Sequence, residues 1–585
     1  MGRRSFEAPP WLARLAPLAA VIALAAVYYA APLRQVTDSR CTLMISESIL
    51  THGTVDLGWI DWDHQRDVEG LPPTLYREGP HVFHYFPEPS AFLSVPLVLA
   101  LRLVGMRAID AAGQVHLGVE EEMQAILASL LTALTVLVIY RTARLRIGRA
   151  PSLGLAVVMA LGTPLLSTLS RALWSSTWAA LLLSVGLYAA LAPGRPSRRA
   201  MIVGSAVALT VCVRPGSIFC AAAVFAVMVL AMRREPTREP TRLPGWALGG
   251  IVALGWLALF VGFSWVAHGS IVPGYYVPDR FAFGSVFRVA LLGTLVSPGR
   301  GLFVFCPFLV VVLVARGPAL LRGERAALLL GLGAHVLLVA SFWHWWGGHS
   351  YGPRLHAETM PLWALLAVDV IRGLEHRSPI GRFAIVNLGA SLGLLSMLIH
   401  LPGATMRDTW AWNALPLSVD IANERLWDPT DLQFLAGLRP REPAPPPPVQ
   451  LEATVLAAYW GHGRHASWWD APGNEPIEPG QPFVWRFDRA CGDHLSLLAD
   501  NNDVYRMRAY DGEVQVADVE IPMRPSEAGG LIVRVAAIEW ACMDRIEVDA
   551  IRGDDRYSVG GIGLYMSLQR WLEAEDRDAL PVYAP

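Results

Sequence analysis

The sequence predicts a polytopic α-helical membrane protein with about eleven transmembrane helices, followed by a β-rich extracytoplasmic domain. Hydrophobic residues make up 53% of the 585 residues and charged residues only 17%, whereas a soluble chain carries about 25% charged residues. The apolar residues are grouped in blocks of about 17–25 residues, the length of a helix that crosses a bilayer. The net charge of −2 leaves no basic excess that would indicate a nucleic-acid partner.

The first apolar block follows Arg3 and Arg4 near the amino terminus. It is longer than the core of a cleaved signal peptide and lacks a good cleavage site, so we expect an uncleaved first helix. Further blocks continue to residue 401, so we predict a transmembrane domain over residues 1–402. The predicted spans cover residues 15–33, 121–140, 151–169, 173–192, 200–213, 216–232, 244–266, 302–315, 326–343, 358–371 and 383–401.

The distribution of arginine predicts the orientation of these spans. The chain contains no lysine, so all 48 basic residues apart from histidine are arginines, and basic loops favour the cytoplasmic side of a membrane. With the amino terminus inside, every cytoplasmic connection carries at least three arginines, and the alternating outer connections carry few. An odd number of spans then places the carboxyl end outside. The arginine-rich connections are residues 141–149, 193–199, 233–242, 316–325 and 372–382.

Two apolar segments in the first outer loop are predicted to lie at the membrane surface. Apolar residues in segment 39–51 recur at the spacing of an amphipathic helix of about three turns, which is too short to span and would lie in the headgroup layer. Segment 90–106 is predicted to form a second interfacial helix, because counting it as a span would invert the arginine pattern.

The chain loses its long apolar runs after residue 402. Residues 403–450 are expected to be an extracytoplasmic connector, with a stiff Pro-rich linker at 439–450. Residues 451–585 contain partly alternating runs typical of a small β-sandwich. Its only cysteines, Cys491 and Cys542, either form a disulfide, as the oxidising side of the membrane allows, or remain as two buried thiols. The three cysteines in apolar spans, Cys212, Cys220 and Cys306, are expected to be packing residues.

Asp38 lies where the first span has ended and the first interfacial helix is about to begin. Aspartate is a favoured helix N-cap, so a capping role and a functional carboxylate are both open on this position alone. The acidic run Glu120–Glu122 lies at the outer end of a span, where solvated charge is the expected role.

Other polar and aromatic residues gather on the same predicted side of the membrane. Single arginines occur at four outer helix ends, namely Arg171, Arg214, Arg300 and Arg354. A lone arginine at such a position normally extends to the interface, but several facing one compartment indicate anion binding, since guanidinium matches phosphate oxygens. Residues predicted to line a cleft near them are His84, Tyr85, Glu88, Trp346, His349 and Tyr351.

Several short segments occur in a characteristic order along residues 15–400. Asp38 is followed by the segment "SRCTLMISESILTHGTVDL" and by "YFPEP", which opens the second interfacial helix. The segments "SRALW", "VRPGS", "SPGRGLF" and "WWGGHSYGPR" come later. This order resembles that of the GT-C superfamily of integral-membrane glycosyltransferases, which includes bacterial aminoarabinose transferase and protein O-mannosyltransferase. The chain shows no P-loop, nucleotide-binding glycine motif, nucleophile elbow or zinc-protease motif that would favour another chemistry.

The resemblance implies a GT-C-like fold in a bacterial inner membrane and a sugar donor linked to polyprenyl phosphate. It implies that Asp38 takes the proton from an acceptor hydroxyl, which attacks the anomeric carbon with inversion. The acceptor would be a glycan, lipid or protein of the cell envelope. Donor phosphate binding is expected from Arg214, Arg300, Arg354 and Arg171. No metal ligand is assigned, and the need for a divalent cation (Mg²⁺ or Mn²⁺) is left open.

Alternative functions remain open at this stage. A lipid or sugar transporter would also place arginines beside spans, although it should carry ionisable residues in mid-membrane. A non-catalytic scaffold in envelope assembly is the other alternative, because the turn that holds Arg171 lacks the second carboxylate of several relatives. In the outer domain, tryptophans could stack on acceptor sugars or simply pack in the core. These residues are Trp460, Trp468, Trp469 and Trp485.

Overall fold

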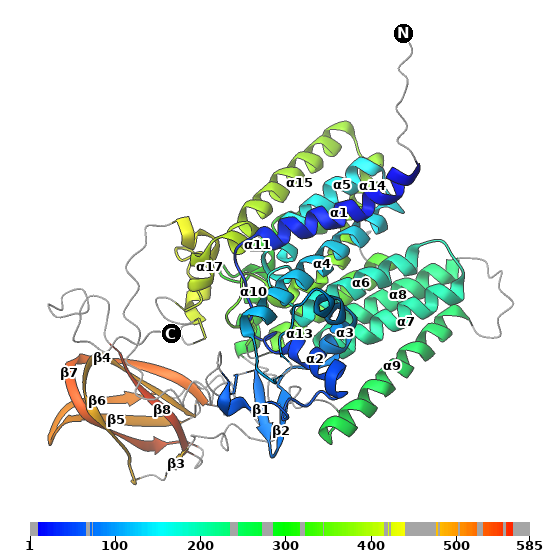
Figure 1. Cartoon of the computed structure of the whole chain (residues 1–585). Helices are drawn as coiled ribbons and strands as arrows, with labels where there is room; N and C mark the ends of the chain where they lie inside the picture. Colours follow the sequence, from blue (N-terminus) through cyan, green and yellow to red (C-terminus); the bar gives the residue numbers. More distant parts are fainter. Residues whose placement is uncertain are drawn as a thin grey trace.

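The computed structural model describes residues 10–565 with several gaps. The gaps are residues 66–70, 73, 111, 235–243, 272–284, 316–321, 343, 415–418, 421–422, 439–474, 478–479, 501–502, 523–530 and 554–556. The Pro-rich linker and the predicted acceptor-stacking residues Trp460, Trp468 and Trp469 therefore lie outside the described residues. Figure 1 shows a large helical domain with a β-sheet beside it.

A helix occurs at each of the eleven predicted spans. Within the described residues, six helices are long and apolar enough to cross a membrane, and these predict a multi-pass membrane protein. The helices at the predicted spans are α1 (Pro10–Ala30), α4 (Leu117–Arg144), α5 (Arg149–Leu161), α6 (Ser175–Leu191), α7 (Pro196–Val213), α8 (Ile218–Arg234), α9 (Gly245–His268), α11 (Leu302–Phe305) with α12 (Phe308–Val314), α13 (Glu324–Ser341), α14 (Met360–Gly373) and α15 (Pro379–His400).

The predicted helices differ from the observed ones in three places. The predicted span 302–315 is broken into α11 and α12 at Pro307, since proline cannot donate a helical hydrogen bond. The predicted span 151–169 ends at Leu161, and a separate π-helical turn, Leu165–Leu169, follows Pro164. An additional helix, α10 (Ser285–Val296), lies in the connection between α9 and α11, where no helix was predicted.

Small residues allow the helices to pack closely. A side-chain carbon added to Gly204 of α7 would lie 2.3 Å from the carbonyl oxygen of Gly249 on α9. A larger residue at Gly204 would therefore force the two helices apart, which is the usual reason for glycine at a helix crossing in membranes. Most of the remaining surface of α9 faces away from the protein, because only 11% of its most apolar stretch is buried by other segments.

Three of the arginine-rich connections meet at one end of the helical domain. Arg146 forms ion pairs with Glu324 and with Asp369, the latter at 3.2 Å. Arg325 also pairs with Asp369 at 2.9 Å, and Arg234 pairs with Glu324 at 3.0 Å. Glu324 begins α13, so this network marks the end of the domain at which α13 starts.

The loop between α1 and α4 folds into a small layer against the helical domain. It contains α2 (Thr42–His52), a hairpin of β1 (Leu75–Glu78) and β2 (His81–His84), and α3 (Pro89–Leu103). Figure 1 shows these elements next to one another, with the β1–β2 hairpin at the lower edge of the helical domain. Residues 42–48 of α2 are all buried, and Ser46 donates to the carbonyl oxygen of Ala91 on α3 at 2.8 Å. The position of α2 at the headgroup layer stays a prediction, but the helix does not present a free polar face. This helix packs within the protein.

The carboxyl-terminal domain is a single antiparallel sheet of six strands in the order β3-β8-β4-β7-β5-β6. The predicted two-sheet sandwich is therefore wrong for the described residues. The long strands β4 and β7 connect both halves of the sheet, and residues such as Leu497, Met507 and Ile546 form one core. The strands are β3 (Glu475–Ile477), β4 (Phe483–Asp500), β5 (Val504–Asp511), β6 (Val514–Ile521), β7 (Leu531–Arg552) and β8 (Tyr557–Tyr565).

Cys491 of β4 and Cys542 of β7 lie opposite each other in this sheet and are joined by a disulfide. Trp485 packs against the sheet core, with its ring 5.8 Å from that of Phe483. Of the two alternatives given for the tryptophans of this domain, Trp485 therefore follows core packing rather than the stacking of a sugar.

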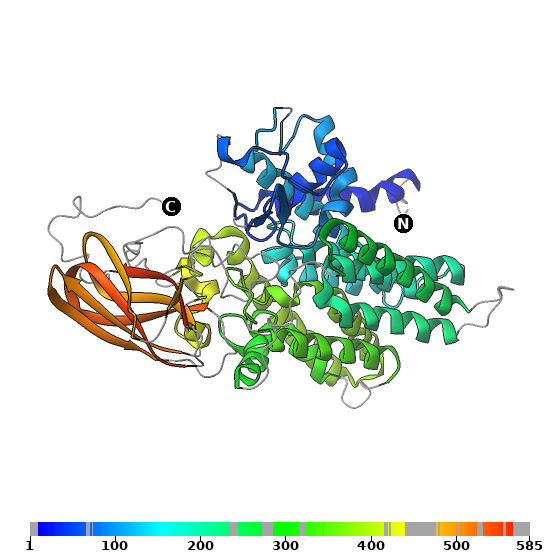
Figure 2. The same ribbon diagram turned by 90° about the horizontal axis from the view of Figure 1, so that it is seen from below.

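Short helices of the connector lie between the two domains in sequence. They are α16 (Pro402–Thr405), α17 (Arg407–Ala411) and the 3₁₀ turns Asn423–Trp427 and Gln433–Leu438. Figures 1 and 2 both show the sheet beyond this yellow segment, on the side of the molecule away from α7, α8 and α9.

Candidate functional site

The chain leaves α1 in an extended segment that carries Asp38 toward the centre of the molecule. The backbone N–H of Leu33 donates to the carbonyl oxygen of Ala404 at 3.2 Å, and that of Gln35 donates to the carbonyl oxygen of Arg171 at 3.2 Å. These bonds to two distant segments fix the path of residues 31–37, which otherwise lack helical structure.

Asp38 does not cap α2, so the capping role is excluded for this residue. The residue before the helix is Cys41, which has a left-handed backbone (φ 69°) and forms no side-chain cap. The carboxylate of Glu120 on α4 instead accepts hydrogen bonds from the backbone N–H groups of Cys41 (2.9 Å) and Leu43 (3.1 Å). The expectation that Glu120 is solvated is therefore wrong, since its side chain is 1% exposed and serves as the cap.

The carboxylate of Asp38 forms an ion pair with Arg354. Arg354 begins a 3₁₀ helix, Arg354–Thr359, and also donates to the carbonyl oxygen of Gly347 at 3.0 Å. Its guanidinium lies 3.8 Å from the ring centre of Trp174. Stacking and hydrogen bonding thus hold the cation at one orientation beside Asp38.

Asp38 and Arg354 line a cavity with about 1120 Å³ of empty space, part of it open to solvent. One wall is apolar and includes Leu338, Val339 and Phe342 from the last turn of α13 and the residue after it. Because α13 starts at the arginine–carboxylate network, the cavity lies at the opposite end of the helical domain from that network. The polar lining residues include Asp38, His84, Ser175, Arg214, Arg354 and Glu358.

Glu358 is a second carboxylate in this cavity, and the sequence analysis missed it. Its oxygen Oε1 accepts hydrogen bonds from Nε of Arg214 at 2.6 Å and from the hydroxyl of Ser217 at 3.1 Å. Burial raises the pKa of Glu358, but the positive charge of Arg214 lowers it by more than burial raises it. The pKa of Glu358 therefore lies below its ordinary value. The sequence did contain a signal for Glu358: it is an acidic residue four positions after Arg354 and stands at the first position of a predicted span.

Of the predicted cleft residues, His84 is the one that lines the cavity. Its two ring nitrogens face the carbonyl oxygens of Phe86 at 3.0 Å and Arg40 at 2.9 Å. Burial lowers the pKa of His84, although these carbonyl contacts oppose the shift. His84 therefore mainly holds the loop around Arg40 next to Asp38.

Arg171 does not line this cavity, contrary to the prediction. Its guanidinium is fully buried and donates to the carbonyl oxygens of Ala31 (2.9 Å) and Tyr28 at the end of α1, and to the hydroxyl of Ser170 (2.9 Å). The carbonyl groups at a helix end lack partners within the helix. Arg171 satisfies them, which leaves it as a structural residue that anchors α1.

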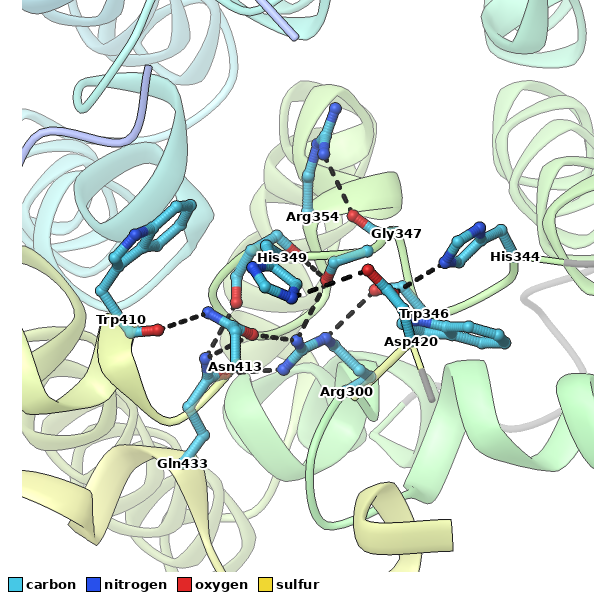
Figure 3. Close-up of polar contacts among 12 residues, drawn as sticks. Arg300, His344, Trp346, Gly347, His349, Arg354, Trp410, Asn413, Asp420 and Gln433 are labelled. Carbon is cyan, nitrogen blue, oxygen red and sulfur yellow. Dashed lines mark hydrogen bonds and ion pairs between the residues drawn. The ribbon is translucent and has the colours of Figure 1, made fainter. Parts of the chain in front are cut away.

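Arg300 likewise lies in a separate buried network rather than in the cavity (Figure 3). It donates to the side-chain oxygens of Gln433 (2.7 Å) and Asn413 (2.6 Å) in the connector and to the carbonyl oxygen of Trp346 (3.1 Å). Burial lowers the pKa of Arg300 to about 9, so the group still carries its charge at neutral pH. This arginine binds the connector to the loop that precedes Arg354.

The other predicted cleft residues also lie outside the cavity lining. Trp346 donates to Asp420 at 2.7 Å, and His349 lies 3.7 Å from the same carboxylate. Figure 3 shows both residues around Arg300, while Arg354 points away from this group. Tyr351 is buried and donates to the carbonyl oxygen of Ile399.

The predicted residues Glu88 and Tyr85 have local structural partners. Glu88 lies 2.7 Å from His268 at the end of α9, and both side chains are 2% exposed. Tyr85 packs edge-on against Phe86. These contacts connect the start of α3 to α9 and do not supply a ligand to the cavity.

The described residues do not fit a divalent cation. No group of three or more histidine, cysteine, aspartate or glutamate side chains among them could hold a metal ion. The two cavity carboxylates, Asp38 and Glu358, are each paired with an arginine. A cation at either carboxylate would have to displace a guanidinium.

The helices and the cavity together define a multi-pass membrane protein with a charged site at one end of its helical domain. Comparisons by sequence give no matching family model and no match among curated proteins. By structure, the chain is similar to ArnT from Cupriavidus metallidurans in the apo state, with 16% identity over 72% of this chain and 75% of that chain and a TM-score of 0.40.

ArnT bound to undecaprenyl phosphate matches with 15% identity over 72% of this chain and 75% of that chain, also with a TM-score of 0.40. The oligosaccharyltransferase of Archaeoglobus fulgidus matches with 13% identity over 75% of this chain and 61% of that chain, with a TM-score of 0.36. These are structures of the GT-C superfamily, the one that the sequence motifs resemble. With TM-scores below 0.5, the similarities describe a related course of the chain and decide nothing about the activity.

Proposed function

We propose that the protein is a GT-C-type membrane glycosyltransferase that moves a sugar from a polyprenyl-phosphate donor to a cell-envelope acceptor. This proposal rests on one observation: Asp38, Arg214 and the pair Arg354 and Glu358, which come from three separate segments of the chain, line one cavity. This cavity lies at the end of the helical domain away from the arginine-rich connections, and we place it at the outer face of a bacterial inner membrane.

The reaction needs a base and a stabilised leaving group. Asp38 takes the proton of an acceptor hydroxyl as its oxygen forms the new bond to the anomeric carbon. The bond from that carbon to the phosphate oxygen breaks on the opposite face, and polyprenyl phosphate leaves with the bonding electron pair. A positioned base of this kind contributes a factor of about 10²–10⁴ in rate.

Arg354 and Arg214 both line the cavity, and we assign the binding of the donor phosphate to these two guanidinium groups. The negative charge on the phosphate increases as it leaves, and fixed cations in a partly enclosed site stabilise this charge strongly. Arg354 is paired with Asp38. A phosphate that competes for this guanidinium would free the carboxylate of Asp38 to accept a proton, so donor binding would prepare the base.

Glu358 weakens the reason for the scaffold alternative. That alternative is open because the turn holding Arg171 lacks a second carboxylate. Glu358 lines the same cavity as Asp38 and supplies a carboxylate from a different segment.

The test is sugar transfer by the unaltered protein and by Asp38→Asn in nanodiscs, with a panel of radiolabelled polyprenyl-phosphate sugars. We expect transfer to fall by about 10²–10⁴ while binding of undecaprenyl phosphate is retained. Full activity in the variant would remove Asp38 as the base. No transfer from any donor by the unaltered protein would favour a non-catalytic scaffold.

A further inference from the structure

Glu358 has one carboxylate oxygen that is engaged and one that is not. Oε1 accepts from Arg214 at 2.6 Å and from Ser217 at 3.1 Å. Oε2 is buried and accepts no hydrogen bond from any residue that the structure describes. A buried charged acceptor without a donor is unfavourable. Since Glu358 also lines the cavity, the missing donor can come from the molecule that occupies the cavity.

The charges around Glu358 restrict what this donor can be. Arg214 keeps the pKa of Glu358 below its ordinary value despite burial, so the free oxygen belongs to a carboxylate. An anion would be repelled by this oxygen. An ammonium group would be repelled by the guanidinium of Arg214, which already balances the carboxylate. A neutral hydroxyl can donate to Oε2 without either penalty.

The position of Arg214 indicates which part of the bound molecule carries this hydroxyl. In the proposed function, Arg214 binds the donor phosphate, and the transferred sugar is attached to that phosphate through one oxygen atom. Glu358 is hydrogen-bonded directly to Arg214, so a sugar attached to a phosphate at Arg214 would lie within reach of Glu358. Resting on that function, we propose that Glu358 binds a hydroxyl group of the donor sugar and thereby selects which sugar is transferred.

The test measures affinities in nanodiscs for undecaprenyl phosphate and for the same lipid carrying glucose, galactose, mannose or arabinose. The readout is the ratio between the affinity for a sugar-carrying lipid and that for the bare lipid. Glu358→Gln removes the charged acceptor and is expected to lower this ratio about tenfold for the preferred sugar. Ser217→Ala is the matched control, because it removes a bond to Oε1 and leaves Oε2 untouched. If Glu358→Gln does not fold, Glu358→Asp is measured in its place. It keeps the carboxylate but shortens the side chain by one methylene, so the ratio should again fall because the free oxygen is withdrawn from the sugar hydroxyl.

The outcomes separate this inference from the proposed function. If the unaltered protein binds none of the five lipids, the proposed function is overturned and this inference falls with it. If Glu358→Gln weakens bare and sugar-carrying lipids by the same factor, Glu358 only holds Arg214, and the inference alone is overturned. The inference alone is also overturned if no sugar-carrying lipid binds more tightly than the bare lipid to the unaltered protein, or if Ser217→Ala lowers the ratio as much as Glu358→Gln does.

Discussion

Asp38 and Arg354 are separated by 316 residues in the chain and form an ion pair in the wall of one cavity. Each is held by its own support. Backbone hydrogen bonds to Ala404 and Arg171 fix the segment before Asp38, and Trp174 stacks on the guanidinium of Arg354. The pair joins a carboxylate that can accept a proton to a cation that can bind a phosphate, which is why it is the centre of the proposed site.

Replacement of Arg354 should reduce phosphate binding. We expect Arg354→Ala to weaken the binding of undecaprenyl phosphate by about 10- to 100-fold, since hydrogen bonds to charged groups are stronger than neutral ones. Arg354→Lys should bind undecaprenyl phosphate with an intermediate affinity. The ammonium group keeps the positive charge but cannot form the two parallel hydrogen bonds of a guanidinium. Binding is measured in nanodiscs, with Arg34→Ala as the control, a partly exposed arginine that bonds to the end of α1. Equal affinities for the unaltered protein and Arg354→Ala would remove Arg354 from the phosphate site.

Glu120 should act as a positioning residue for Asp38. Glu120→Ala leaves the backbone N–H groups of Cys41 and Leu43 without their acceptor, and a buried unpaired group costs about 1–3 kcal/mol. We expect a lower melting temperature and a lower kcat, with little change in KM for the donor, because the turn that carries Asp38 loosens. The neighbouring Glu121→Ala is the control. A kcat in Glu120→Ala equal to that of the control would contradict this role.

Arg300 should be required for stability rather than for donor binding. Arg300→Met removes the buried charged donor that bonds to the oxygens of Gln433 and Asn413 and to the carbonyl oxygen of Trp346, so we expect a loss of at least about 3 kcal/mol in the free energy of unfolding. Thermal unfolding in detergent measures this. Arg489→Met, which breaks an exposed ion pair with Asp511 in the outer sheet, should change little. A stable Arg300→Met protein with weakened lipid binding would return Arg300 to the phosphate site.

Acid should destabilise the contact between the connector and the loop before Arg354. Burial raises the pKa of Asp420, but the charge of His344 and several hydrogen bonds lower it more strongly, so the pKa lies well below its usual range. A carboxylate with a depressed pKa stabilises the fold above its unfolded-state pKa of about 4, and this stabilisation is lost as the pH falls toward the folded-state value. Between about pH 5 and pH 3, the melting temperature of the unaltered protein should therefore fall more steeply than that of Asp420→Asn. If the melting temperatures of the two proteins fall equally steeply with pH, Asp420 is not responsible for the loss of stability in acid.

The apolar blocks of the sequence were sufficient to place the helices, because a bilayer requires long apolar segments wherever the chain crosses it. A helix lies at each of the eleven predicted spans, although Pro307 breaks one of them. The helix α10 and the single six-stranded sheet were not predicted. Short apolar runs and alternating strands carry a weaker pattern, and strand pairing depends on contacts between segments far apart in the chain.

The structure brings only some of the predicted site residues together, for a related reason. All four predicted arginines lie at helix ends, and the sequence offers no means of separating those that face a ligand from those that bond to the protein. Arg171 bonds to the carbonyl groups of α1 and Arg300 to the connector, whereas Arg214 and Arg354 line the cavity. Glu358 was missed because its partner Arg214 lies 144 residues away.

The sequence by itself determined that the chain crosses a membrane many times, that its arginines collect in alternate connections, and that Asp38 follows the first span. Hydropathy and charge act over short stretches, so they can be read residue by residue. Only the tertiary structure decided which charges meet: Asp38 with Arg354, Arg214 with Glu358, and Glu120 with the start of α2. Buried polar groups must find partners wherever the packed helices bring them together, and that depends on the whole fold.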